Sequence, residues 1–179
     1  MFRIQVLCLL LSFSLFAEEI AGRVVRVADG DTITVLVSGG TRSVASETVG
    51  SRVPRDRTSE SIRLHGIDAP EKKQAFGNVS RKFLSGLVAN REVRVTYTKR
   101  DRYGRIVGIV YLDGRDVNLE MLRAGLAWHY KKYDSTPAYA QAEAAARAAK
   151  RGLWQDKSPI EPESFRKAMR GGKEKGGND

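Results

Sequence analysis

The segment Ser-Ile-Arg-Leu-His-Gly-Ile-Asp-Ala-Pro-Glu, residues 61–71, carries more chemically useful side chains on a short piece of backbone than any other part of the sequence. Its first residues alternate between apolar and polar, with Ile62 and Leu64 on one face and Arg63 on the other. Alternation with a period of two is typical of a β-strand that buries one face. We therefore expect a strand that packs against a core and presents a guanidinium group outward.

Two carboxylates follow this strand. Pro70 fixes its own φ angle and favours an extended backbone at the residue before it, so Asp68 and Glu71 are not expected on a helical turn. Hard divalent cations prefer carboxylate oxygens, and an arginine fork matches phosphate oxygens, so the group suits phosphodiester chemistry. Acidic turns after strands are common, however, and an ordinary structural turn explains this stretch equally well when it is taken alone.

The rest of the chain predicts a small β-barrel with helical cover. Residues 22–37 alternate in a β manner around Asp29-Gly30-Asp31, which predicts a tight hairpin; taken singly, Asp31 is most simply a turn residue. Two more strands are expected at 92–98 and 106–112, and helices near 76–88, 116–124 and 136–151. The expected fold class is mainly β with helices (α+β): a five-stranded OB-type Greek-key barrel covered by about three helices.

The expected domain organisation has three parts. Residues 1–17 resemble a signal peptide, because one positive residue and an apolar run precede Ala17, and this predicts an exported protein, periplasmic or extracellular. Leu15 stands where a small residue is preferred, so an uncleaved N-terminus is the alternative. Residues 18–155 are expected to form the barrel domain with an exposed insertion at 38–60, and residues 156–179 a polar, partly disordered tail.

The composition restricts the classes of partner that the protein is expected to bind. A chain of 179 residues suits one domain, and its formal net charge of +10 indicates an acidic partner, most commonly nucleic acid. The basic residues are scattered rather than gathered on one amphipathic helix, which disfavours a membrane surface. The loop Lys-Arg-Asp-Arg-Tyr-Gly-Arg, residues 99–105, is either an anion-binding loop or a solvated hairpin tip. Outside the apolar run that holds Cys8, the chain has no thiol and two histidines, which disfavours zinc.

Four motifs, in this order and spacing, resemble those of the thermonuclease family, whose type member is staphylococcal nuclease. They are Asp29-Gly30-Asp31-Thr32, Ile62-Arg63-Leu64, Ile67-Asp68-Ala69-Pro70-Glu71 and Asp101-Arg102-Tyr103-Gly104-Arg105. The resemblance runs from about Gly22 to Trp154. It implies a Ca²⁺-dependent nuclease, a hydrolase that cleaves phosphodiester bonds of DNA, RNA or both and leaves 3′-phosphates.

The resemblance also implies a role for individual residues of the site. Asp31, Asp68 and the carbonyl of Ala69 would hold the Ca²⁺ ion. Glu71 would orient or deprotonate the attacking water, and Arg63 and Arg105 would contact the scissile phosphate.

On the substrate side, the resemblance places Arg102 and Tyr103 near a terminal phosphate of the bound nucleotide and Tyr130 near a base. Two features depart from the family pattern. The type member has threonine where Ala69 stands, which implies tuning of the metal site rather than its loss, because the ligand there is a carbonyl. The insertion at 38–60 is longer than the family leads us to expect and leaves substrate preference open.

The alternative function is that of a non-catalytic OB-fold protein that binds nucleic acid, as degenerate relatives of the family do after losing the acidic and arginine set. A basic structural protein of the cell envelope is a third possibility. We expect a monomer with no stable protein partner and no membrane span in the mature chain. The sequence does not decide between DNA and RNA or between cutting at ends and in interiors.

Overall fold

The computed structural model describes residues 17–37 and 58–174. The expected signal peptide, except for its last residue, and most of the expected insertion at 38–60 lie outside the described residues. Within the described part of the chain, no helix is both long and apolar enough to cross a membrane.

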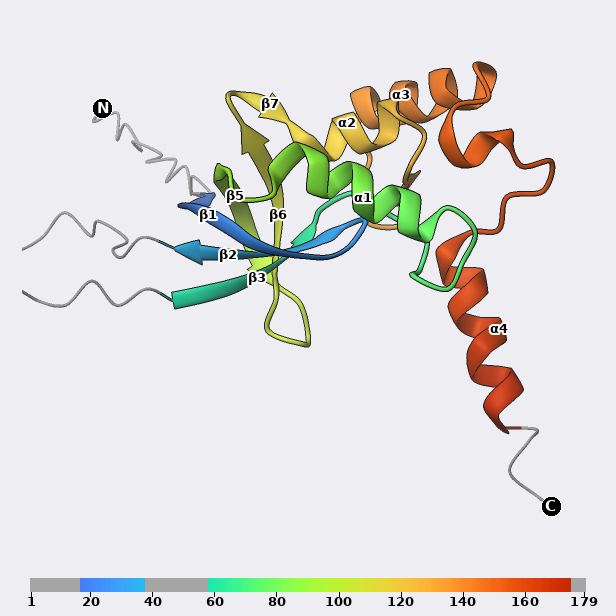
Figure 1. Cartoon of the computed structure of the whole chain (residues 1–179), viewed down its shortest axis with the longest axis horizontal. Coiled ribbons are helices and arrows are strands. Elements are labelled where there is room, and N and C mark those ends of the chain that lie inside the picture. Colours follow the sequence, from blue (N-terminus) through green and yellow to red (C-terminus); the bar gives the residue numbers. More distant parts are fainter. Residues whose placement is uncertain (1–16, 38–57, 175–179) are drawn as a thin grey trace, which may run out of the picture.

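Five long strands form a closed barrel, as the sequence predicted (Figure 1). They are β1 (Glu18–Asp29), β2 (Thr32–Val37), β3 (Thr58–Leu64), β5 (Glu92–Arg100) and β6 (Ile106–Leu112). The order around the sheet is β3-β2-β1-β5-β6, with antiparallel neighbours throughout. A parallel pairing of β3 with β6, in which Ile62 lies opposite Ile106, closes the barrel.

Three short strands complete the pairing. The two-residue strand β4 (Ile67–Asp68) follows β3 and pairs with β8 (Trp128–His129), so that Asp68 lies opposite Trp128. Strand β7 (Arg115–Asp116) extends β6 as a hairpin. The β4–β8 pair ties the segment after β3 to the helical part of the chain.

Four α-helices and a short 3₁₀ helix surround the barrel. They are α1 (Gly77–Val88), α2 (Val117–Arg123), α3 (Pro137–Ala148), the 3₁₀ helix η1 (Gly152–Gln155) and α4 (Pro162–Glu174). Figure 1 shows α1, α2 and α3 gathered on one side of the barrel, whereas α4 projects away from it. Asp116 caps the start of α2, because its side chain accepts a hydrogen bond from the Leu119 N–H.

The packing of the core determines which side chains of β3 point out of the barrel. Ile62 and Leu64 are buried in the barrel interior together with Ile33 of β2 and Ile106 of β6. Successive side chains on a strand point to opposite faces, so Arg63 lies outside the core, with its side chain 19% exposed.

Two segments differ from the expectations drawn from sequence. Strand β3 begins at Thr58 and so includes the last three residues of the expected insertion, because backbone pairing with β2 continues through its polar residues. The segment expected as a polar, partly disordered tail contains α4, which extends through Glu174. Pro162 and Glu163 in its first turn favour a helix start, and Phe165 packs toward the barrel domain, where it lines a pocket with Phe76.

Candidate active site

Arg63 lies between two buried aspartates. Its guanidinium group donates a hydrogen bond to Asp31 Oδ1 through one nitrogen and to Asp68 Oδ1, at 2.7 Å, through the other. Asp31 and Asp68 are 1% and 3% exposed. The end of β3, the β1–β2 hairpin and β4 therefore converge on one point, although Asp31 and Asp68 are distant in sequence.

The β1–β2 hairpin reaches the site because Gly30 lacks a side chain. A Cβ atom at this position would collide with Ser80 Oγ of α1 and lie 2.7 Å from the Cβ atom of Ala69. The close approach lets the Ala69 N–H donate a hydrogen bond to Asp31 Oδ2 at 2.7 Å. Thr32 Oγ1 donates a further bond to Asp31 Oδ1 at 3.1 Å, so the carboxylate is held from three sides.

The electrostatics of this pair reflect its burial. Burial raises the pKa of Asp31 to about 8, although the positive charge of Arg63 opposes the shift. For Arg63, burial acts to lower the pKa, but the charges of Asp31 and Asp68 outweigh it and raise the pKa above its usual value. A second positive charge beside Asp31 would therefore favour its ionised form.

A second arginine, not anticipated from the sequence, reaches the same carboxylates from α4. Arg166 donates to Asp68 Oδ2 at 2.9 Å and Oδ1 at 3.2 Å, and to Glu71 Oε1 at 2.8 Å. Burial acts to lower the pKa of Arg166, but its hydrogen bonds to Asp68 and Glu71 outweigh burial and raise it. Arg166 thus joins Glu71 to the buried pair and attaches α4 to the site.

Arg105 lies beside Asp101 in the loop between β5 and β6. Its Nε donates to Asp101 Oδ2 at 2.7 Å, and its backbone N–H donates to Asp101 Oδ1 at 3.0 Å. Burial acts to raise the pKa of Asp101, but these bonds lower it overall. Among the described residues, the ion pairs of Arg105 do not include Asp31 or Asp68; Arg105 immediately precedes β6, whose Val107 lies opposite Arg63 in the barrel.

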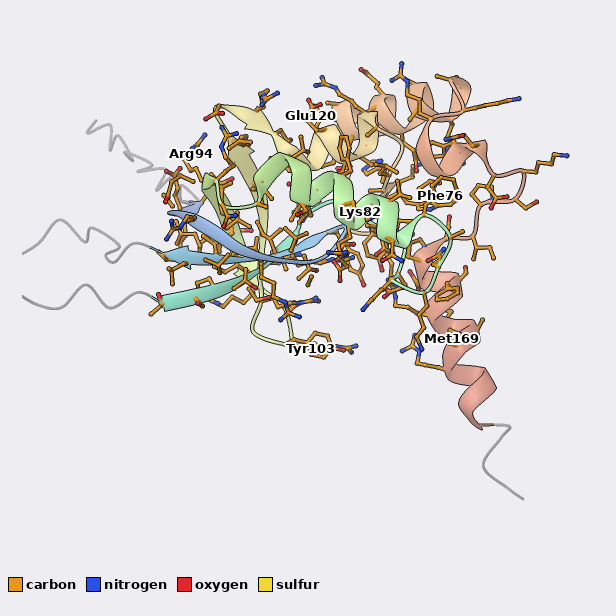
Figure 2. All side chains as sticks on the ribbon, viewed as in Figure 1. Phe76, Lys82, Arg94, Tyr103, Glu120 and Met169 are labelled. Carbon is orange, nitrogen blue, oxygen red and sulfur yellow. The ribbon has the colours of Figure 1, made fainter. Side chains whose placement is uncertain are left out.

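The other loop residues lie at the surface. Tyr103 is 68% exposed at the tip of the β5–β6 loop, which projects from the barrel in Figure 2. Arg102 Nη2 donates to the Tyr103 hydroxyl at 2.7 Å, and the guanidinium groups of Arg102 and Arg105 lie 4.8 Å and 5.5 Å from the centroid of the tyrosine ring. The loop presents cations around an aromatic ring, which suits contact with nucleic acid.

Tyr130 lies close to the site on another side. It lines a pocket of about 190 Å³ together with Asp68 and the first residues of α4. Its hydroxyl donates to Glu163 Oε2 at 3.1 Å. Burial and this bond to a carboxylate raise the pKa of Tyr130 to about 12, so its hydroxyl stays protonated at neutral pH.

The donor set at this point fits a hard cation. Asp31, Asp68 and Glu71 bring three carboxyl groups beside the positive charges of Arg63 and Arg166. Burial raises the pKa of Asp31, and a cation bound next to it would favour its ionised form. In the part of the chain that the structure describes, no three histidine, cysteine, aspartate or glutamate residues are grouped closely enough to hold a metal ion by themselves. A cation here would therefore take two carboxylates together with carbonyl and water oxygens, which is within the coordination habits of Ca²⁺.

Comparisons with known proteins identify the family of this chain. A family model described as "Staphylococcal nuclease homologue" matches residues 61–156. A protein of Escherichia coli named "Uncharacterized endonuclease" is 44% identical over 160 residues, covering 89% of this chain and 93% of that protein. A protein of Haemophilus influenzae with the same name is 40% identical over 169 residues, covering 92% of this chain and 85% of that protein. A rice protein named "Probable staphylococcal-like nuclease CAN2" is 41% identical over 109 residues, covering 61% of this chain and 30% of its own length.

Proposed function

Because the chain belongs to the staphylococcal nuclease homologue family and is a nuclease, we propose that it is a Ca²⁺-dependent enzyme that hydrolyses phosphodiester bonds of DNA, RNA or both. The observation that carries the proposal is the pair of buried aspartates bridged by Arg63, with Glu71 joined to Asp68 through Arg166. Asp31, Asp68 and the Ala69 carbonyl are the proposed ligands of the ion. When bound, Ca²⁺ would supply positive charge to the phosphate oxygens.

The proposed roles of the remaining residues follow from the charge that develops during hydrolysis. Glu71 accepts a proton from the attacking water, whose oxygen forms the new bond to phosphorus. Arg63 and Arg105 donate hydrogen bonds to the phosphate oxygens, whose negative charge increases in the transition state. The bond from phosphorus to the 5′ oxygen breaks, this oxygen takes up a proton from solvent, and Glu71 releases its proton to solvent. The products are a 3′-phosphate and a free 5′-hydroxyl.

The proposed substrate contacts come from two further segments. Arg102 and Tyr103, exposed on the β5–β6 loop, contact a terminal phosphate, and Tyr130, in the pocket beside Asp68, contacts a base. The hydroxyl of Tyr130 is protonated at neutral pH and so can donate a hydrogen bond to a base edge.

Incubation of the full chain with plasmid DNA and with RNA, in Ca²⁺ or in chelator, tests the proposal. We expect cleavage only with Ca²⁺, and products that a 3′-phosphatase can dephosphorylate. Digestion indifferent to chelation would contradict the metal requirement. Salt-sensitive binding without cleavage in either condition would instead support a non-catalytic nucleic-acid-binding protein.

We also propose that the protein is exported and acts as a monomer. The apolar run after Arg3 supports export. Fractionation of cells that express the full chain, beside cells that express it without residues 1–17, tests this. We expect nuclease activity outside the cytoplasm only for the full chain, and a monomer mass by light scattering.

A further inference from the structure

Helix α4 borders the site although it lies beyond residues 61–156, which the family model matches. Phe165, Arg166, Met169 and Arg170 are spaced at i, i+1, i+4 and i+5, so they share one side of the helix. This side and the residues that follow Pro70 line a groove of about 350 Å³. We call it the α4 groove; its lining comprises Glu71, Lys72, Lys73, Phe165, Arg166, Met169 and Arg170.

The charge of the α4 groove is strongly positive. Lys72, Lys73, Arg166 and Arg170 bring four cations, against the one carboxylate of Glu71. Arg166 is paired with Asp68 and Glu71, but among the described side chains no ion pair involves Lys72, Lys73 or Arg170, all of which are exposed. Gathered cations without counterions repel one another, and an anionic ligand relieves that repulsion.

Apolar surface lies among these cations. Phe165 is half-buried, and Met169, labelled on α4 in Figure 2, is 50% exposed. Cations that follow a phosphate backbone, combined with flat or polarisable side chains on which bases stack, are typical of sites for single-stranded nucleic acid. A paired duplex keeps its bases stacked on one another and leaves this apolar surface without a partner.

We infer that the α4 groove binds a single-stranded segment of nucleic acid that leads away from the bond to be cleaved. The inference rests on the proposed function and adds a binding site for the strand. Arg166 anchors α4 through Asp68 and Glu71, so the groove opens directly beside the catalytic carboxylate. Lys72, Lys73 and Arg170 contact phosphates, and Phe165 and Met169 contact bases.

Binding without cleavage provides the first test. A fluorescein-labelled single-stranded oligonucleotide of about ten nucleotides is titrated with the full chain in chelator at several salt concentrations. For each phosphate contact removed, the slope of log K against log salt should shrink by about 0.7. We expect this reduction for Arg170→Ala, and about twice as much for the double variant Lys72→Ala, Lys73→Ala, together with several-fold weaker binding.

Lys167→Ala is the matched control. It removes the same charge from the same helix, but Lys167 does not line the groove and pairs with Glu163 at 3.2 Å. We expect it to bind nearly as the parent does. Groove variants that bind with the parental affinity and slope, or a Lys167→Ala variant that loses as much as Arg170→Ala, would overturn the inference.

Steady-state cleavage provides the second test. It distinguishes a helix α4 that binds the strand from one that only covers the site and limits access to it. We expect Arg170→Ala to raise KM for the oligonucleotide several-fold more than for a dinucleotide, which is too short to fill the groove. Faster cleavage of both substrates, with unchanged binding, would make α4 only a cover over the site and overturn the inference.

The two proposals fail in different ways. A protein that cleaves with Ca²⁺ but whose groove variants bind normally remains the proposed nuclease, and the α4 groove is then not a strand-binding site. A protein whose groove variants lose binding in chelator but that never cleaves keeps the groove and loses the proposed reaction.

Discussion

Arg63 has no close substitute in the site, because it is the group that bridges Asp31 and Asp68. We predict that Arg63→Ala lowers kcat/KM on an oligonucleotide on the order of a thousandfold, as expected for loss of a charge partner of the transition state. Arg105→Ala should give a loss of similar size. Arg63→Lys is the matched variant, since it keeps the positive charge but lacks the planar guanidinium group that donates two hydrogen bonds at once. Its kcat/KM should stay well below that of the parent.

Activity of either alanine variant within tenfold of the parent would remove that arginine from the mechanism. The result for Arg105 is the more informative one, because its ion pair in this structure is with Asp101 rather than with the aspartates of the site.

Arg63 should also matter for stability. Its removal leaves Asp31 and Asp68 buried without their shared partner, and breaking such a buried pair costs about 3–5 kcal/mol. We predict a loss of this size for Arg63→Ala in urea unfolding in chelator. The control Arg94→Ala breaks an exposed pair with Glu19 and should cost no more than about 1 kcal/mol. Equal losses would mean that the buried pair contributes nothing specific.

At the scale of residues, the sequence predicted some of the side chains that meet in the site and missed others. The Asp-Gly-Asp turn and the strand ending in Arg63 pointed to residues that the structure brings together. Arg166 was missed because it stands 95 positions beyond Glu71, and the contact depends on how α4 docks. No local pattern encodes that docking.

At the scale of elements, Asp134 connects β8 to α3. Its carboxylate accepts hydrogen bonds from the Thr136 N–H and hydroxyl at the start of α3, at 3.0 Å and 2.8 Å. It also lies 2.7 Å from Nε2 of His129 in β8. Burial acts to raise the pKa of Asp134, but the bonds from Thr136 and His129 lower it overall.

Because the pKa of Asp134 is lowered in the folded protein, its contribution to the free energy of unfolding is larger at neutral pH than in acid. A carboxyl group whose pKa is lower in the folded state stabilises the fold above its unfolded pKa of about 3.9, and this contribution is lost as the pH falls through the folded value. We predict that Asp134→Asn lowers the free energy of unfolding by roughly 1–3 kcal/mol at pH 7 and by progressively less as the pH falls below about 4. Urea unfolding across this pH range measures the difference.

The control for this prediction is Asp113→Asn. The Asp113 side chain is 64% exposed and pairs with Arg91, so its substitution should change stability little at any pH. A deficit in Asp134→Asn that stays constant down to pH 2 would show that the ionised carboxylate is not the stabilising form.

The sequence predicted some helices and strands more accurately than others. Strands and helices with strong periodicity, such as β6 and α1, were expected close to their observed bounds. Strand β3 starts earlier than expected because its first residues are polar, and only pairing with β2 makes them a strand. Helix α4 was not predicted, because its sequence is mostly polar and its ordered position depends on contacts with the distant site.

At the scale of the whole molecule, metal binding should be visible as stability. A ligand that binds only the folded state stabilises it by about 2.7 kcal/mol at a concentration of 100 times its Kd. We predict that saturating Ca²⁺ raises the melting temperature of the parent and that Asp31→Asn and Asp68→Asn largely abolish this rise. Asp156→Asn, at an exposed aspartate after η1, should respond to Ca²⁺ as the parent does.

Thermal unfolding in Ca²⁺ and in chelator measures this for each variant. An equal rise in all four proteins would place the ion elsewhere on the molecule. The absence of any rise in the parent would mean that the carboxylates do not hold Ca²⁺ without substrate.

The barrel as a whole was predictable because five patterned segments admit few closed arrangements, and the parallel β3–β6 contact, like the β1–β5 pairing, is one that the sequence does not display locally. The β3–β6 contact joins residues 44 positions apart, from Ile62 to Ile106, and must form after β5 and β6 have been synthesised. A nascent or truncated chain that stops before β5 therefore leaves the edges of both β1 and β3 without partners. Such edges pair readily with other chains, so fragments of this kind should aggregate and depend on chaperones, whereas the finished protein should not.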